Sequence, residues 1–159
     1  MAVNRGKQFE DKFKHDWLLT VPGSMCYRLY DTTSGYKAIS NVGDFICYKY
    51  PFVYLIDCKS TQGNTLSFND IRQFEKMCEY YPIEGVKVGV MWWSIKNDKV
   101  VWIPINTLIQ LKKDNKKSFN IKMLNDDTYY ALEIPSYKKR VFMDSDYSCL
   151  IENSSKGDF

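Results

Sequence analysis

The segment DFICYKYPFVYLIDCKS, residues 44–60, constrains the fold of this chain more than any other feature of the sequence. Its apolar and aromatic run predicts two β-strands that meet at a turn near Pro51. Side chains alternate between the two faces of a strand, so Asp57 and Lys59 share one face of the second strand. If the two strands are antiparallel, Asp44 lies near the same end of the pair. We therefore expect three charged side chains to converge at one rim of a β-sheet.

The periodicity of apolar residues predicts helices and further strands around this hairpin. Phe9, Phe13 and Trp17 recur at i, i+4 and i+8, the spacing of one face of an α-helix. Helices are expected at residues 4–19, 68–81 and 104–111, and strands at residues 25–30, 44–50, 53–59, 86–94, 99–103, 119–123 and 128–134. This order of helices and strands predicts an α/β (α+β) fold.

Length and composition predict a single folded domain. The chain has 159 residues, of which 45% are apolar and 26% are charged, and these values are typical of a soluble globular protein. We assign residues 1–145 to this domain, with a projecting arm at about 31–43 and a flexible tail at 146–159. The apolar stretches fall far short of the roughly 20 residues of a membrane span, and the N-terminus lacks a signal-peptide pattern. The prediction is a cytoplasmic protein without a membrane partner.

Residue counts and spacings disfavour several classes of chemistry. The five cysteines are scattered without a Cys-x-x-Cys pair, which speaks against a disulfide framework and against a zinc site. His15 is the single histidine, and its Lys- and Asp-rich surroundings favour a solvated surface position over a catalytic base. The formal net charge is only +3, but basic residues cluster at 112–117 and at 138–140. Such clusters can form a phosphate-binding patch, and solvated loop lysines explain them equally well.

Asp44 and Asp57 beside Lys59 suggest metal-assisted cleavage of a phosphodiester bond. Two nearby carboxylates repel each other unless a cation lies between them, and Mg²⁺ takes one or two protein carboxylates together with waters and phosphate oxygens. An adjacent lysine can stabilise the extra negative charge of the transition state. From the Asp-x-Lys triplet alone, an ion pair between Asp57 and Lys59 at a strand end is the simpler interpretation.

A larger pattern resembles the signature of the PD-(D/E)xK nuclease superfamily. Gly43-Asp44, an extended apolar strand, Asp57-Cys58-Lys59 and then a helix with Gln73 follow one another in the order of that signature. From residue 4 to about residue 140, the chain is also similar to the RecU Holliday-junction resolvases of low-GC Gram-positive bacteria and their phages. The similar segments are NRGKQFE (4–10), DIRQFEKM (70–77), VGVMWWSIKNDKVVWIPINTLIQL (88–111) and NKKSFNIKM (115–123).

The resemblance implies a restriction-endonuclease-like core, a mixed central β-sheet flanked by helices. It also implies a site for Mg²⁺ (or Mn²⁺), one or two ions per subunit. Asp44 and Asp57 would hold the metal with a contribution from Gln73, and Lys59 would stabilise the transition state. Glu10, on the first helix, would complete the acidic cluster. The alternative for Glu10 is an exposed i, i+4 partner of a lysine, and the alternative for Gln73 is a plain surface position.

The resemblance also implies contacts with DNA and with a second subunit. Arg5 looks like a phosphate contact, with a solvated residue at a helix start as the alternative. The arm at 31–43 corresponds to the family's stalk, which enters the open centre of a four-way junction. There Tyr36 and Lys37 would stack on bases and bind phosphates, and a disordered loop is the alternative. A junction has two strands to cut symmetrically, so the family reaction implies a homodimer, and a RecA-type recombinase is a further candidate partner.

Two departures from the family pattern affect the metal site. Asp57 stands where the family usually carries glutamate, and residues 41–43 replace a threonine-rich tract that supplies one metal ligand. The expected function is a divalent-metal-dependent endonuclease that resolves four-way DNA junctions by symmetric paired nicks in recombination and repair. The alternatives are a nuclease of the same superfamily acting on duplex DNA, of restriction or repair type, and a non-catalytic DNA-binding modulator of recombination. The intact Asp44, Asp57 and Lys59 speak against the non-catalytic alternative.

Overall fold

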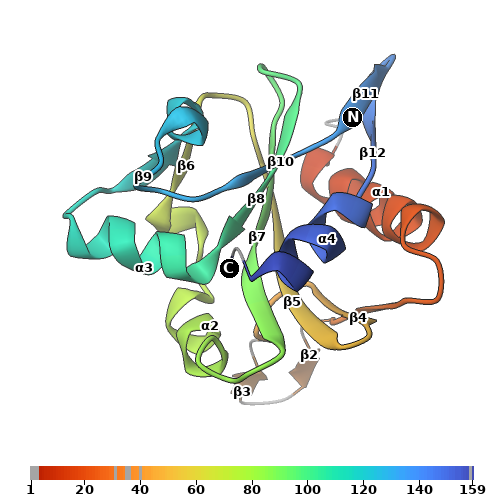
Figure 1. Ribbon diagram of the computed structural model, residues 1–159, viewed down its shortest axis with the longest axis horizontal. Helices are drawn as coiled ribbons and strands as arrows, with labels where there is room; N and C mark the ends of the chain where they lie inside the picture. Colours follow the sequence, from red (N-terminus) through yellow and green to blue (C-terminus); the bar gives the residue numbers. More distant parts are fainter. Residues whose placement is uncertain (1–3, 31, 35–36, 40, 158) are drawn as a thin grey trace.

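A six-stranded mixed β-sheet forms the centre of the molecule in the computed structural model, which describes residues 4–30, 32–34, 37–39, 41–157 and 159 (Figure 1). In spatial order its strands are β1 (Met25–Arg28), β4 (Phe45–Lys49), β5 (Phe52–Thr61), β7 (Val86–Ser94), β8 (Lys99–Pro104) and β10 (Leu132–Ile134). The β5–β7 pair is parallel and the other neighbouring pairs are antiparallel. The expected mixed sheet is confirmed.

Helices cover both faces of the sheet and give the molecule two apolar cores. The helices are α1 (Arg5–Thr20), α2 (Phe74–Tyr80), α3 (Ile105–Lys113) and α4 (Ser148–Lys156), with 3₁₀ turns η1 (Phe68–Asp70) and η2 (Ile121–Asn125). One core joins α1 and α4 to the sheet, and the other joins α2 and α3 to the opposite face. Phe9, Phe13 and Trp17 of α1 are all buried in the first core, as their helical spacing predicted. The expected flanking helices are therefore confirmed.

The β4–β5 hairpin has the alternation that its sequence predicted. Tyr54, Ile56 and Cys58 of β5 point into the core that contains α1, while Leu55 packs in the core that contains α2 and α3. Asp57 is therefore directed to the α2 and α3 side of the sheet. The strands are antiparallel, and Phe45 pairs with Ile56, which puts the residue before β4 beside Asp57.

Short two-stranded sheets complete the structure at its periphery. They are β2 (Thr32–Ser34) with β3 (Lys37–Ile39), β6 (Thr65–Ser67) with β9 (Ser118–Asn120), and β11 (Ser136–Lys139) with β12 (Phe142–Ser145). The β2–β3 pair falls within the arm expected at 31–43 and lies below the main body in Figure 1. Residues 31, 35–36 and 40 of that arm lie outside the described residues.

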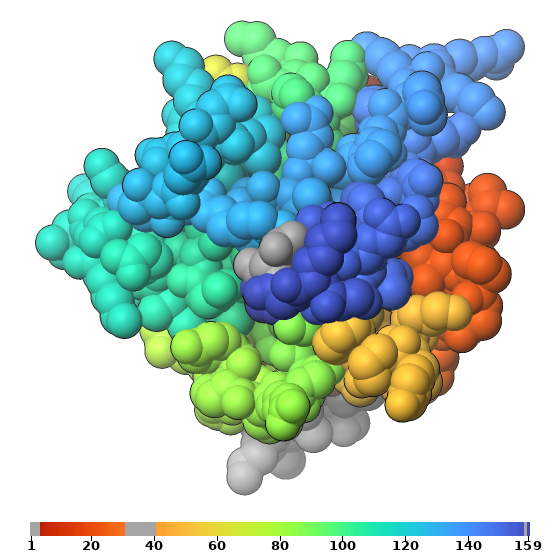
Figure 2. Space-filling view, viewed as in Figure 1, coloured from red at the N-terminus to blue at the C-terminus, as the bar shows by residue number. Residues whose placement is uncertain are grey.

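The C-terminal segment differs from the flexible tail expected at 146–159. Helix α4 lies across the centre of one face in Figure 2, and its residues Leu150 and Ser154 are buried, as is Tyr147 just before it. The hydroxyl of Tyr54 in β5 donates a 2.8 Å hydrogen bond to Ser154 Oγ. The sequence did not predict this helix because only a few of its residues are buried. They pack on a core that the sheet and α1 already provide, and this packing stabilises the helix.

Two other segments also differ from expectation. The helix expected over 68–81 is divided into η1 and the shorter α2, so that Gln73 becomes the residue just before α2. The strand expected over 119–123 ends at Asn120, where the side chain of Asn120 accepts a hydrogen bond from the amide of Lys122 and the chain turns into η2. Both changes follow from local side-chain capping, in which Ser67 or Asn120 starts a 3₁₀ turn.

Candidate active site

Gly43 and Asp44 are held against the backbone of β5. The amide of Asp44 donates a 2.9 Å hydrogen bond to the carbonyl of Ile56, and Asp44 Oδ2 accepts a 2.7 Å hydrogen bond from the amide of Cys58. A Cβ atom at position 43 would lie 2.8 Å from the Ile56 carbonyl oxygen, so only glycine permits this approach. The Gly-Asp pair therefore fixes one carboxylate at the rim of β5 and leaves its second oxygen uncommitted by that contact.

Asp57 is a fully buried carboxylate beside a lysine. Its exposed fraction is 0%, and Lys59 Nζ lies 3.2 Å from Asp57 Oδ2. Within the described residues, neither carboxylate oxygen of Asp57 has a hydrogen-bond partner. Burial raises the pKa of Asp57 to about 8, Lys59 opposes this rise, and the neighbouring Asp44 adds to it. Burial alone would lower the pKa of Lys59, but Asp57 and Asp44 together raise it above its ordinary value.

These groups adjoin a cleft of about 680 Å³. The cleft is lined by Asp44 before β4, by Lys59, Ser60 and Thr61 of β5, by Asn69 and Asp70 of η1, and by Arg72 and Gln73 of the turn between η1 and α2. Gln73 Oε1 is buried and has no hydrogen-bond partner within the described part of the chain. The structure thus brings Asp44, Lys59 and Gln73 to one cleft, with Asp57 in contact with Lys59.

Glu10 of α1 approaches this group from the other side of the hairpin. Burial and the charge of Asp44 raise the pKa of Glu10, whereas Arg28 and Lys59 lower it. The carboxylate of Glu10 forms an ion pair with the guanidinium of Arg28, which also bonds Asp11 at 2.7 Å. The exposed lysine pair considered as the alternative for Glu10 is therefore not the contact that forms.

Arg28 is a charged neighbour of the site that sequence reasoning missed. It is the last residue of β1 and pairs with Phe45 of β4, and the next residue, Leu29, donates its amide to the Asp44 carbonyl at 2.7 Å. Only the register of β1 against β4 places Arg28 beside Asp44, and no local motif signals that register. Asp70 and Arg72 were missed for a similar reason, because they reach the cleft through the turn that interrupts the expected helix.

Of the three candidate DNA contacts, the structure describes the side chain of Arg5 but not those of Tyr36 and Lys37. Arg5 begins α1 and is partly exposed, and it is not among the residues that line the cleft. Tyr36 lies outside the described residues. Lys37 begins β3, and its side chain is likewise outside the described part of the structure.

The oxygen ligands of the cleft fit a hard divalent cation. Mg²⁺ uses one or two protein carboxylates and fills its other positions with water or phosphate oxygens. The buried oxygens of Asp57 and Gln73 without partners, together with Asp44, supply this set. No group of three or more His, Cys, Asp or Glu side chains suited to a metal occurs among the described residues.

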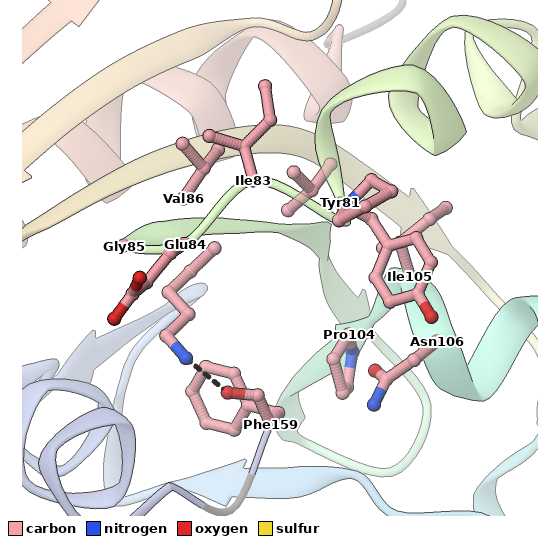
Figure 3. Close-up of a pocket in the computed structure, with 12 residues that line it drawn as sticks. Tyr81, Ile83, Glu84, Gly85, Val86, Pro104, Ile105, Asn106 and Phe159 are labelled. Carbon is pink, nitrogen blue, oxygen red and sulfur yellow. Dashed lines mark hydrogen bonds between the residues drawn. The ribbon is translucent and has the colours of Figure 1, made fainter.

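A second, smaller pocket of about 240 Å³ lies at the far end of β7 (Figure 3). Ile83 and Val86 line one side of it, and Pro104 and Phe159 line the other. Lys87 donates a hydrogen bond to the main-chain oxygen of Phe159. The lining of this second pocket is mainly apolar and lacks the paired carboxylates of the first cleft, so we do not assign a catalytic role to it.

Comparisons with known proteins find similarity at the level of structure. No protein-family model and no curated protein matches the chain. Among solved structures, the chain is similar to Hjc, a Holliday junction resolvase from the archaeal hyperthermophile Archaeoglobus fulgidus. The TM-score is 0.49 and the sequence identity is 13%, over 78% of this chain and 91% of that chain. With similarity this low, the function has to be inferred from the residues of the cleft.

The described helices were also compared with the requirements of a membrane span. None of them combines the length and the apolar character needed to cross a bilayer.

Proposed function

We propose that this protein is a divalent-metal-dependent endonuclease that hydrolyses phosphodiester bonds in DNA. The observation that carries the proposal is the convergence of Asp44, Lys59 and Gln73 from three separate segments on one cleft, with the buried Asp57 in contact with Lys59. A buried carboxylate is costly to the fold, and two neighbouring carboxylates with one lysine leave negative charge that a bound divalent cation would compensate. The order of these residues in the sequence, which resembles the PD-(D/E)xK signature, supports the same chemistry.

In this proposal, Asp44 and Asp57 are held in place by different contacts. Asp44 is oriented by the Cys58 amide, and Asp57 is oriented by its burial in β5, so both would hold Mg²⁺ or Mn²⁺ without rearrangement of the backbone. Gln73 would add its amide oxygen from the other wall of the cleft. When bound, one or two such ions would polarise the phosphoryl oxygens and lower the pKa of the attacking water.

Lys59 acts as a positive charge in this proposal. Asp57 and Asp44 keep its pKa above the ordinary value, so at neutral pH the ammonium form dominates. A permanently protonated lysine cannot accept the proton of the attacking water, but it can stabilise negative charge that develops on the phosphate. Glu10, held by Arg28, would extend the acidic cluster on the α1 side.

The preferred substrate in this proposal is a four-way DNA junction, cut by symmetric paired nicks. The support is the resemblance of the sequence to junction resolvases and the separate β2–β3 pair in the region of the expected arm. Symmetric cutting of two strands requires two active sites, so the proposal includes a homodimer. A RecA-type recombinase as partner and a cytoplasmic location belong to the same proposal.

Cleavage of a four-way junction with a mobile core, compared with linear duplex of the same sequence, tests the proposed function. We expect Mg²⁺- or Mn²⁺-dependent nicks at symmetric positions in two opposing strands, with little cutting of the duplex. Equal cutting of both substrates would favour the duplex nuclease, and no cutting with any divalent ion would favour the non-catalytic protein.

Substitution of the carboxylates tests the site itself. Asp44→Asn or Asp57→Asn should lower cleavage by at least about a hundredfold, because the metal loses a charged ligand. Junction binding without metal should persist or tighten, since one negative charge near the phosphates is gone. Asp127→Asn, at an exposed position outside the cleft, is the matched control and should cleave normally. Normal cleavage by either cleft variant would refute the assignment.

A further inference from the structure

The end of α3 and the loop that follows it carry three exposed lysines, and the carboxylate of Asp114 between them interacts electrostatically with Lys113 and Lys116. Lys113, Lys116 and Lys117 are exposed, and within the described residues none of them forms an ion pair. Lys112 of the same segment differs, because it pairs with Glu75 at 2.9 Å and lies over the ring of Phe74. We call Lys113, Lys116 and Lys117 the α3 loop lysines.

This loop is attached to the wall of the cleft. The amide of Phe68, the first residue of η1, donates a 3.1 Å hydrogen bond to the carbonyl of Lys117. The next residue of the chain, Ser118, pairs with Ser67, and β6 and β9 lie side by side in Figure 1. The turn that follows η1 supplies Arg72 and Gln73 to the cleft. Through Lys117, the α3 loop lysines are therefore attached to the segment that forms one wall of the cleft.

Two lysines of the second basic cluster, residues 138–140, are held in ion pairs with carboxylates. Lys138 and Lys139, in the β11–β12 hairpin, form ion pairs with Asp98 at 2.9 Å and Asp144 at 2.8 Å. Asp144 also pairs with Lys12 of α1, which ties this hairpin to the opposite core. Two clusters that look alike in the sequence therefore differ. The hairpin lysines are held in close ion pairs, whereas among the described residues the α3 loop lysines form none and interact with Asp114 only at longer range.

We propose that the α3 loop lysines bind the sugar-phosphate backbone of the DNA arm that leaves the cleft on the α3 side. Unpaired ammonium groups at an exposed loop are free to replace the counterions of phosphates, whereas ion-paired lysines must first lose their partners. Arg72, an exposed residue that lines the cleft and has no ion pair among the described residues, continues the positive surface toward the scissile phosphate. This inference rests on the proposed function and adds the path of the substrate to it.

The test compares two triple variants of the full chain that remove the same charge. One is Lys113→Ala with Lys116→Ala and Lys117→Ala, and the control is Lys138→Ala with Lys139→Ala and Arg140→Ala. Binding to a labelled four-way junction is measured in EDTA, without cleavage, from about 50 to 200 mM salt. The loop variant should bind at least about tenfold more weakly, with a salt slope smaller by about two to three, because three phosphate contacts are lost.

The control variant should lose clearly less affinity, and a variant with Arg at positions 113, 116 and 117 should bind within about threefold of the wild type because it keeps the charge. An unchanged salt slope in the loop variant, or an equal loss in the hairpin variant, would overturn the inference. Because binding is read without metal, wild-type binding without Mg²⁺-dependent cleavage would refute the proposed function while leaving this comparison valid. Absence of any wild-type binding would overturn both.

Discussion

Asp57 is a residue whose burial opposes folding and to which the proposed function gives a role in metal binding. It is buried on a strand among Val, Leu and Ile, and its oxygens have no hydrogen-bond partner among the described residues. Loss of hydration makes the ionised form costly, which is why the pKa of Asp57 rises to about 8. Burial therefore shifts Asp57 toward its neutral form, and the Lys59 ammonium 3.2 Å away opposes that shift.

The raised pKa predicts a pH dependence of stability for the metal-free protein. An unfolded aspartate ionises near its ordinary pKa of about 3.9, whereas the folded group ionises near 8, so the folded state binds more protons between these values. The contribution of Asp57 to the free energy of unfolding should therefore fall as pH rises from about 4 to 8, by at most about 1.4 kcal/mol per pH unit.

Urea unfolding in EDTA at pH 5, 7 and 9 measures this dependence. Asp57→Asn keeps the shape of the side chain without the charge, so the variant should gain stability relative to the wild type as the pH rises. The difference between the two proteins isolates Asp57 from the cysteines, which also titrate. A constant difference across this range would contradict the raised pKa.

At the scale of the element, the β4–β5 junction depends on one close backbone contact. Gly43→Ala places a Cβ against the Ile56 carbonyl, so the segment that carries Asp44 must move away from β5. We expect a loss of about 1–3 kcal/mol in the free energy of unfolding, and a fall in cleavage of at least about tenfold as Asp44 leaves its position.

Gly63→Ala is the matched control for this change, because a Cβ at that position meets nothing within 4 Å. Thermal unfolding and cleavage should be close to those of the wild type. If Gly43→Ala behaved like Gly63→Ala in both measurements, the close contact would not be what positions Asp44.

The sequence was sufficient to predict elements whose pattern is local. The alternation along β5 and the spacing of Phe9, Phe13 and Trp17 on α1 predicted which faces are buried, because these periods follow directly from strand and helix geometry. The convergence of Asp44, Asp57 and Lys59 was predictable for the same reason. Arg28 was not, because its place beside Asp44 depends on how a distant strand pairs with β4.

At the scale of the whole molecule, the C-terminal helix closes one of the two cores. Leu150 is fully buried and joins Phe13 and Trp17 in the core on the α1 side of the sheet. Leu150→Ala should therefore lower the free energy of unfolding by about 2–4 kcal/mol, because it leaves a cavity. Glu152→Ala, at an exposed position of the same helix, should change it by less than about 0.5 kcal/mol. Equal effects in denaturant unfolding would mean that α4 is not docked as described.

The pairing of β5 within the sheet determines which part of the cleft is already formed before a substrate binds. Asp57 and Lys59 lie beyond the last β4–β5 pair and are paired with β7, and residues of a paired strand open only in rare, large fluctuations, whereas a short turn such as that between η1 and α2 opens often. Amide-hydrogen exchange should accordingly be slow at Asp57 and Lys59 and fast at Arg72 and Gln73. The acidic half of the site would then exist before any nucleic acid arrives, and adjustment to the substrate would take place in the other wall.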